Sequence, residues 1–261
     1  MVISKNCKDM EETLKNKNDH LRIMVDFLKK RKNPNILELG VERGSSTTAF
    51  CWIAEQINGS VFSVDIDDCS DAVISDKWKF IQSNDLNYKF ILKKFEKLEK
   101  EGIDLIYIDS YHENHHVLKL LNIWFKFVKK DGAIFIDDID SFPFRKIKDT
   151  WNSIVYDLTN EAVKEFYYAN HEKIFYTKYF GENGLAKLQK LTNFGDEQNQ
   201  HKLIWNYNPL VKFIYPYLRF IPFLTHLCLL LVYFLDSIIQ IFVKTHLKEI
   251  FPVGYFFTAK K

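Results

Sequence analysis

A ten-residue stretch, YIDSYHENHH from Tyr107 to His116, places three histidines and two carboxylates close together in the chain. His112 precedes His115 and His116 by three and four residues, the spacing that puts side chains on one face of a helix. Such a pair could bind zinc, but zinc needs a further ligand, and the sequence has neither an HExxH motif nor a cysteine cluster. The histidines by themselves therefore do not predict a zinc site.

Aspartates that follow two apolar runs give a second set of candidate metal ligands. Asp109 follows IDLIYI, and Asp137 and Asp138 follow GAIFI. If these runs are neighbouring parallel strands, the three carboxylates converge at one edge of the sheet and repel one another unless a cation binds them. Hard cations such as Mg²⁺ prefer carboxylate oxygens. The alternative is that the aspartates cap the following helices or face water singly.

A glycine-bearing turn, ELGVERGSS, lies between an apolar run and an amphipathic stretch. Gly40 and Gly44 would let the backbone approach a ligand, and the following helix, with Ser45 or Ser46 as its N-cap, would present free N–H groups. The spacing matches neither GxGxxG nor a GxxxxGK[ST] phosphate loop. Glu38 would repel a phosphate and suits a cationic or hydroxyl-bearing ligand. The alternative is a tightly packed turn without a ligand.

Apolar runs that alternate with amphipathic stretches predict the elements that position these residues. A helix is expected within residues 9–31, and Pro34 then favours an extended start. The sequence predicts strands at residues 35–40, 60–66, 78–83, 103–109 and 132–138. It predicts helices at residues 45–57, 86–100 and 115–129.

Strands that alternate with helices indicate a doubly wound α/β fold, in which a parallel sheet is covered on both faces. Ligands of such sheets bind outside the carboxyl ends of the strands, where Asp65 is placed to hydrogen-bond a ribose diol. Residues 173–190 read as an antiparallel hairpin at the sheet edge. We expect an N-terminal helical segment (1–33), an α/β domain (34–195) and an apolar helical tail (196–261).

Five segments follow one another along the chain: ILELGVERGSST, FSVDIDD, FIQSND, IDLIYIDSYH and VKKDGAIFIDDID. In this order and spacing they resemble the motifs of class I S-adenosylmethionine-dependent methyltransferases. The resemblance covers residues 35–190, since GENGLAKL is similar to that family's last hairpin. More narrowly, the chain resembles the branch of small-molecule O-methyltransferases that methylate sugars and natural products, often with a bound divalent metal. The resemblance implies a Rossmann-like methyltransferase sheet that is mostly parallel and ends in an antiparallel hairpin.

The resemblance implies roles for residues at the cofactor end. Glu38 and Gly40 would border the methionine and ribose parts of S-adenosylmethionine, Asp65 would bind the ribose hydroxyls, and Asn84 or Asp85 would lie near the adenine. This chain has Ser83-Asn84 where relatives have a Gly-Asp pair. The full set of candidate cofactor-binding residues is Glu38, Gly40, Gly44, Ser45, Asp65, Asn84, Asp85 and Asp109.

The resemblance also implies Mg²⁺ or another divalent cation on Asp109, Asp137 and Asp138, because metal-binding relatives use carboxylates at these three positions. Relatives carry Asp-Gly-Asp-His where this chain has Asp109-Ser110-Tyr111-His112, so Tyr111 replaces an acidic residue that serves as general base in some of them. His112 is the candidate replacement for that base. Tyr111 is a second candidate, or it shapes the substrate pocket. His115 and His116 have no counterpart and are expected at the surface or the crevice rim.

The composition restricts the choice of function and location. The chain has 261 residues, 47% of them hydrophobic, and a formal net charge of +2. It can bury a sizeable core, and its charge gives no electrostatic argument for nucleic acid. Its four cysteines have no CxxC spacing and are expected to be reduced thiols. The polar start, MVISKNCKDMEE, lacks the apolar run of a signal peptide, so we expect a cytoplasmic location.

The tail contains an apolar stretch at residues 220–243, FIPFLTHLCLLLVYFLDSIIQIFV, which is long enough to span a bilayer. Asp236 argues against a simple span, since a carboxylate in mid-membrane is unfavourable. Residues 213–248 are expected to lie in a membrane interface, to form a homodimer contact, or to pack on the protein itself.

Three functions are compared. The first is an enzyme: a metal-assisted O-methyltransferase that acts on a small hydroxylated acceptor. The second is a catalytically degenerate methyltransferase-fold protein that serves as a binding or membrane-associated scaffold, which the loss of the Gly-Asp pair and the presence of Tyr111 keep open. The third, methylation of nucleic acid or protein, is disfavoured because DSYH stands where amino-methylating enzymes commonly carry Asn/Asp-Pro-Pro-aromatic.

Overall fold

The computed structural model describes residues 10, 14, 19–139, 150–180 and 183–198 of the chain. Within this part, the helices are α2 (Asp19–Leu28), α3 (Ser45–Ile57), α4 (Tyr88–Lys94), α5 (Glu96–Glu101), α6 (Asn114–Trp124), the short 3₁₀ helix η2 (Phe125–Phe127) and α7 (Thr150–Asn170). The strands are β1 (Asn35–Leu39), β2 (Ser60–Asp65), β3 (Trp78–Gln82), β4 (Ile103–Ile108), β5 (Val128–Ile136), β6 (Ile174–Tyr179) and β7 (Leu185–Lys190).

The strands form one seven-stranded sheet in the order β3-β2-β1-β4-β5-β7-β6. The first five pair in parallel, and β7 lies antiparallel to both β5 and β6. Successive strands are added toward β3 on one side of β1 and toward β6 on the other, so the strand order switches between the parallel strands β1 and β4. The carboxyl ends of these two central strands therefore border the crevice in which such sheets bind ligands. The predicted doubly wound sheet with an antiparallel last hairpin is therefore confirmed.

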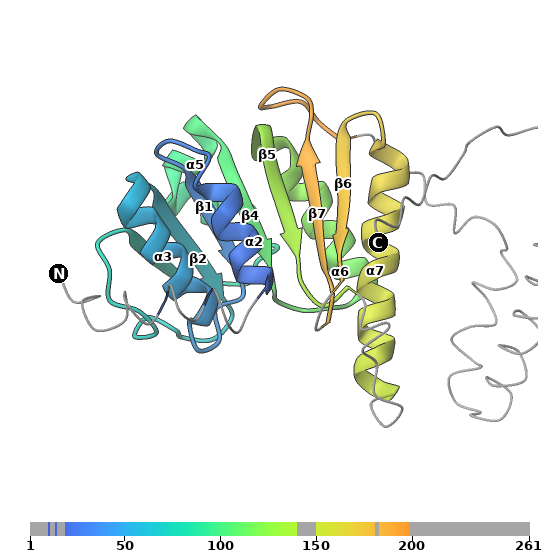
Figure 1. The fold of residues 1–261 in the computed structure, drawn as a ribbon, viewed down its shortest axis with the longest axis horizontal. Helices are drawn as coiled ribbons and strands as arrows, with labels where there is room; N and C mark the ends of the chain where they lie inside the picture. The colour runs from blue at the N-terminus through green and yellow to red at the C-terminus, as the bar shows by residue number, and fades with distance from the viewer. Residues whose placement is uncertain (1–9, 11–13, 15–18, 140–149, 181–182, 199–261) are drawn as a thin grey trace, which may run out of the picture. The chain divides into compact units, whose positions relative to one another are not determined.

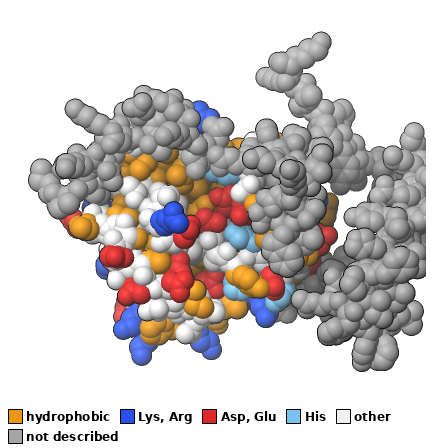
Figure 2. Space-filling model, turned by 90° about the horizontal axis from the view of Figure 1, so that it is seen from below, with side chains coloured by type: hydrophobic (Ala, Val, Ile, Leu, Met, Phe, Trp, Pro, Cys, Tyr) orange, Lys and Arg blue, Asp and Glu red, His pale blue; other side chains and the backbone are white. Residues whose placement is uncertain are grey.

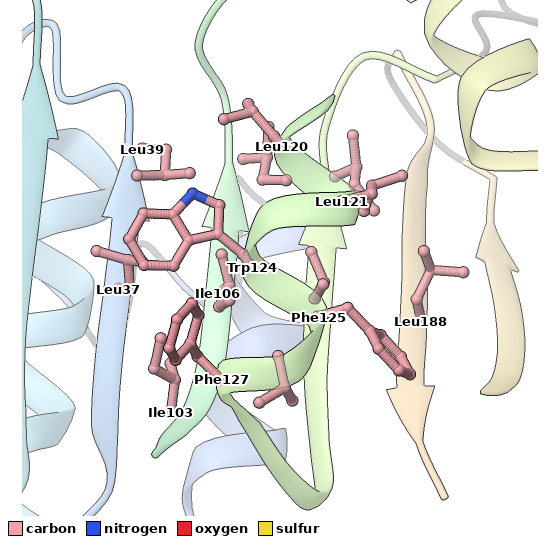
Figure 3. Packing of buried hydrophobic residues seen from close by; sticks show 14 of the residues in the cluster. Leu37, Leu39, Ile103, Ile106, Leu120, Leu121, Trp124, Phe125, Phe127 and Leu188 are labelled. Carbon is pink, nitrogen blue, oxygen red and sulfur yellow. The ribbon is translucent and has the colours of Figure 1, made fainter. Parts of the chain in front are cut away.

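Helices cover both faces of this sheet, as Figure 1 shows. On one face, α2 and α3 pack with buried residues such as Met24, Phe50 and Leu105. On the other, α4, α5, α6 and α7 enclose a second cluster, in which Trp124 of α6 packs over Leu37 of β1 (Figure 3). Strands β1 and β4 are buried at every position because both faces are covered. The backbone ends of these strands are thus held rigidly.

Two of the predicted helices differ from those in the structure. The helix expected at residues 86–100 is divided into α4 and α5, because Phe95 leaves helical geometry (φ −113°, ψ 56°) and buries its ring 5.0 Å from that of Phe62. The helix expected at residues 115–129 ends at Trp124, because Val128 already pairs with Ile103 as the first residue of β5. The spacing of apolar residues alone does not distinguish one continuous helix from a helix that is interrupted or is followed directly by a strand.

The end of the domain is joined to the core by one buried lysine. Lys190 closes β7 with its side chain fully buried, and its Nζ donates to the carbonyls of Phe125 (3.1 Å) and Asp196 (3.0 Å). Its ammonium group also lies 4.7 Å from the centre of the Phe125 ring. The residues that follow the last strand are therefore part of this unit.

The chain divides into two units, Met1–His201 and Lys202–Lys261, and all of the described residues belong to the first. The apolar tail predicted to contact a membrane or a second copy lies outside the described residues, so that expectation stays a prediction. Among the helices that the structure does describe, none combines the length and the apolar character needed to cross a membrane. Cys51 and Cys69, the two cysteines within the described ranges, are buried free thiols.

Candidate active site

Three side chains that could bind a metal converge where β4 and β5 end. Asp109 follows β4, Asp138 follows β5, and His112 lies in the loop before α6. One potential ligand atom from each lies within 4.8 Å of the other two. His112 Nε2 is 3.4 Å from Asp109 Oδ1 and 3.7 Å from Asp138 Oδ2. Figure 2 looks onto this edge of the sheet, where acidic and histidine side chains gather.

The electrostatics of this cluster favour a positive charge between the carboxylates. Burial raises the pKa of Asp138 to about 6, and Asp137 and Asp109 add to the shift, while His112 and a hydrogen bond from Asn183 oppose it. Burial lowers the pKa of His112, but its hydrogen bond to Asp109 and the charge of Asp138 outweigh that effect and raise it overall. An imidazolium in this position partly neutralises the carboxylates, and a divalent cation would do so more completely.

Asp137, predicted as a third metal ligand, is not part of this cluster. Its Oδ1 lies 3.0 Å from His20 Nδ1 and also accepts the backbone N–H of Asp138 (2.9 Å). Its Oδ2 accepts a 2.6 Å hydrogen bond from the hydroxyl of Tyr107. Burial raises the pKa of Asp137, but the hydrogen bonds from His20 and Tyr107 hold it below its ordinary value. His112, predicted as a base, takes the third place in the cluster.

The donor set of the cluster fits a divalent cation. Two carboxylates and one imidazole supply hard oxygen and borderline nitrogen ligands, a combination that suits Mg²⁺, Mn²⁺ or Zn²⁺ according to the number of further oxygens. The Asp109 side chain is 39% exposed, which leaves room for water or an acceptor hydroxyl. Asp138 holds a left-handed backbone conformation (φ 53°). The cluster thus offers three potential metal ligands, and one side of it is open to solvent.

Glu38, predicted to border the cofactor, is fully buried in β1 and accepts three hydroxyl hydrogen bonds. Ser46 Oγ donates to its Oε1 (2.6 Å), and Thr47 Oγ1 and Ser63 Oγ donate to its Oε2 (2.7 and 2.6 Å). Burial raises the pKa of Glu38 to about 7, although the three hydroxyl groups lower it and Asp109 raises it further. The Glu38 carboxyl therefore holds the first turn of α3 against the sheet.

The glycine turn follows directly after Glu38. Gly40 has a φ of +101°, and a Cβ atom placed there would lie 2.1 Å from the carbonyl oxygen of Asp109. Gly44, in a left-handed conformation, is the N-cap of α3, so the prediction that Ser45 or Ser46 caps this helix is wrong. Ser45 is exposed and Ser46 is buried toward Glu38. The turn consequently passes in direct contact with the end of β4.

Asp65 ends β2 beside this turn, as predicted. Its Oδ2 accepts the backbone N–H groups of Val41 (2.7 Å) and Glu42 (3.2 Å), and its Oδ1 accepts that of Asp67 (3.0 Å). Burial raises its pKa, but these backbone hydrogen bonds lower it overall. The ionised carboxylate orders the turn and remains partly exposed toward the crevice.

The two candidates for the adenine end have different environments. Asn84 is exposed, and its Oδ1 accepts the N–H of Leu86 within its own turn (2.9 Å). Asp85 is buried, and its Oδ2 accepts a hydrogen bond from Ser110 Oγ (2.6 Å) and lies 3.1 Å from His116 Nε2. Asp85 is therefore held by two neighbouring side chains, whereas Asn84 contacts only its own turn. The prediction that His116 lies at the surface or the crevice rim is wrong, because it is buried against Asp85.

Tyr111 and His115 lie at the exposed side of this edge. The Tyr111 side chain is 58% exposed, its hydroxyl donates to Glu113 Oε1 (2.6 Å), and its ring meets that of His116 edge-on. The hydrogen bond to Glu113 raises the pKa of Tyr111, which keeps its hydroxyl protonated. His115 is exposed, as expected, 3.4 Å from Glu113.

Sequence reasoning missed two residues of the site. Tyr107 lies within the buried strand β4, where its apolar neighbours suggest a core residue, and its hydroxyl reaches both Asp137 and Asp109. His20 lies in α2, 117 positions before its partner Asp137, and no local motif marks it. A polar side chain in a fully buried parallel strand is the one signal that could have indicated Tyr107.

With the geometry described, the chain can be compared with known proteins. Residues 37–139 match the family described as a methyltransferase domain. No curated protein matches the chain. A solved structure of a Staphylococcus aureus protein, assigned as a caffeoyl-CoA O-methyltransferase, is similar with a TM-score of 0.50 and 17% identity, over 73% of this chain and 92% of that one.

Two further solved structures are similar at slightly lower scores. The SAH-bound methyltransferase PaMTH1 from Podospora anserina has a TM-score of 0.49 and 16% identity, over 70% of this chain and 87% of that one. The MycE methyltransferase from the mycinamycin biosynthetic pathway, solved with Mg and SAH, has a TM-score of 0.49 and 19% identity. The similarity covers 70% of this chain and 51% of MycE.

The family match and the shared fold confirm the predicted resemblance to class I S-adenosylmethionine-dependent methyltransferases. The matched residues run from β1 to the end of β5, so they include the glycine turn and the aspartates of the cluster. Helices α2 and α7 and the last hairpin lie outside the match.

Proposed function

We propose that the chain is an S-adenosylmethionine-dependent O-methyltransferase that acts, with a divalent cation, on a hydroxylated small molecule such as a sugar or a natural product. The observation that supports this most strongly is the contact between the two halves of the site. The position of a Cβ on Gly40 lies 2.1 Å from the carbonyl oxygen of Asp109, so the cofactor turn and the metal-binding cluster adjoin. A methyl donor and a cation-bound acceptor would be neighbours there.

Residues on the cofactor side would hold S-adenosylmethionine along the strand ends. The ionised, partly exposed Asp65 would accept the ribose hydroxyls. Asp85, fixed by Ser110 and His116, would face the adenine. Glu38 would act indirectly, by fixing the start of α3 and hence the N–H groups of the turn.

On the acceptor side, Asp109 and Asp138 would hold the cation, and His112, the third potential ligand of the cluster, would stay unligated and take the proton. When bound, the cation would lower the pKa of the acceptor hydroxyl and orient it in line with the methyl group. In such a transfer the acceptor oxygen would bond to the methyl carbon as the carbon–sulfur bond broke, with a neutral thioether as the leaving group. His112 Nε2 would accept the hydroxyl proton. Tyr111, exposed and kept protonated by Glu113, would line the acceptor entrance.

The proposal is tested with the full-length chain, labelled S-adenosylmethionine, Mg²⁺ or Mn²⁺, and a panel of sugars and other hydroxylated compounds. We expect label to be incorporated into at least one class of acceptor, and a chelator to suppress it. Asp109→Ala and Asp138→Ala should each lower incorporation by ~100-fold or more, because a metal ligand is lost. Asp26→Ala, which removes an exposed carboxylate of α2, is the matched control. Variants that retain full activity would exclude the carboxylate site.

A further inference from the structure

A hydrogen-bonded chain connects the N-terminal helix α2 with the metal-binding cluster. His20 Nδ1 lies 3.0 Å from Asp137 Oδ1, and Asp137 Oδ2 accepts the hydroxyl of Tyr107 at 2.6 Å. The same hydroxyl lies 3.1 Å from Oδ2 of Asp109. These hydrogen bonds therefore connect α2, through the end of β5 and then β4, to Asp109 of the metal-binding cluster.

Two residues of this hydrogen-bonded network, His20 and Tyr107, are tightly packed. His20 and Tyr107 are 4% and 3% exposed, and the ring of Phe50 packs edge-on against Tyr107 at 5.7 Å. The phenol hydroxyl lies within hydrogen-bond distance of both Asp137 and Asp109. A packed, buried donor fixes the direction in which a carboxylate points.

The proton count at Tyr107 shows why this arrangement suits a cation. A phenol has one proton, and here two carboxylates compete for it. The hydroxyl shares its proton between Asp137 (2.6 Å) and Asp109 Oδ2 (3.1 Å), so Asp109 is held in place but only partly neutralised, and its Oδ1 faces the cluster. His112 and a cation are the groups that the cluster offers to complete the neutralisation. The network thus turns Asp109 toward the cluster rather than satisfying it completely.

We propose that His20 and Tyr107 are positioning residues: through Asp137 they fix the Tyr107 hydroxyl and so orient Asp109 for cation binding, which makes α2 a functional part of the site. This inference rests on the metal-assisted function proposed above. The alternative role is structural, in which His20 and Tyr107 only attach α2 to the sheet. The two roles differ in what they change: positioning affects cation affinity at constant cofactor affinity, whereas attachment affects stability and both affinities together.

The test uses the full-length chain with Mn²⁺ as the probe, its affinity measured by electron paramagnetic resonance, and S-adenosylmethionine affinity measured by calorimetry. Tyr107→Phe removes only the hydroxyl and keeps the ring packed against Phe50. We expect it to weaken Mn²⁺ binding by ~10-fold or more, the usual effect of losing a residue that orients metal ligands, with S-adenosylmethionine affinity within ~2-fold of wild type. Tyr88→Phe, a partly buried tyrosine packed on Phe127, is the matched control.

His20 is tested with two substitutions. His20→Leu should weaken Mn²⁺ binding as Tyr107→Phe does, and His20→Asn should restore most of it, because the asparagine amide can donate from the position of Nδ1. If His20→Leu does not fold, Tyr107→Phe decides the question.

Wild-type Mn²⁺ affinity in Tyr107→Phe overturns the inference, and so does a parallel loss of both affinities with the melting temperature. A wild-type chain that binds no Mn²⁺ overturns the inference together with metal assistance. A wild-type chain that binds Mn²⁺ but no S-adenosylmethionine overturns only the proposed enzyme, and the Tyr107 comparison still decides the inference.

Discussion

The buried carboxyl of Glu38 predicts a specific dependence of stability on pH. Burial raises the pKa of Glu38 from its ordinary 4.5 to about 7. Between these values the folded chain holds this proton and the unfolded chain releases it, so the stability that Glu38 contributes falls as the pH rises. Above pH 7, the carboxylate is ionised in both states and the loss is complete.

The size of the effect follows from the two pKa values. A difference of about 2.5 in pKa corresponds to about 3 kcal/mol, at ~1.4 kcal/mol per pKa unit. Integrated between pH 5 and pH 8, the linkage relation gives a loss of roughly 2–3 kcal/mol. Glu38→Gln removes the titration, while the hydroxyls of Ser46, Thr47 and Ser63 can rotate to donate to, or accept from, the amide.

The assay is urea unfolding of wild type and Glu38→Gln across this pH range. The free energy of unfolding of the variant minus that of wild type should rise by roughly 2–3 kcal/mol from pH 5 to pH 8, since the titrations of groups that do not interact with Glu38 cancel in the difference. Glu99→Gln, an exposed position in α5, is the matched control. A difference that stays constant within about 0.5 kcal/mol would refute the argument that Glu38 is protonated in the folded chain.

Three further predictions concern single positions. Gly40→Ala should destabilise the chain by more than ~3 kcal/mol, measured by denaturation, because it combines φ +101° with a backbone clash at Asp109. Asp85→Asn should weaken S-adenosylmethionine binding by ~10-fold in calorimetry, through loss of a charged hydrogen-bond acceptor, and Asn84→Ala should have a smaller effect. Lys190→Met should lower the free energy of unfolding by ~2–4 kcal/mol, because the carbonyls of Phe125 and Asp196 lose their buried donor.

The positions of the site residues at the sheet edge could be predicted because they depend on the order of the strands alone. Five apolar runs in alternation with amphipathic stretches define a parallel sheet, and the residues that end its strands must meet at one edge. Asp65, Asp109 and Asp138 were placed correctly at this edge in that way. The helix breaks at Phe95 and Trp124 could not be predicted, because they depend on how individual rings pack in three dimensions.

The partners of these residues were harder to predict than their locations. Strand-end position does not specify which way a carboxylate turns, so Asp137 was grouped with Asp138 although it points toward Tyr107 and His20. His116 was expected at the surface or the crevice rim because it has no counterpart in the resembling family, yet it lies 3.1 Å from Asp85, 31 residues earlier. Contacts between residues so distant in the sequence become visible only once the fold is known.

The central claim, that this chain is an S-adenosylmethionine-dependent methyltransferase, is tested most directly by calorimetric titration of the full-length protein with S-adenosylmethionine. The account predicts saturable binding at one site per chain, with binding retained in Asp138→Ala and weakened in Asp65→Ala. An absence of binding at millimolar concentrations of the cofactor, with the protein shown to be folded, would contradict the account and favour a catalytically degenerate protein with this fold.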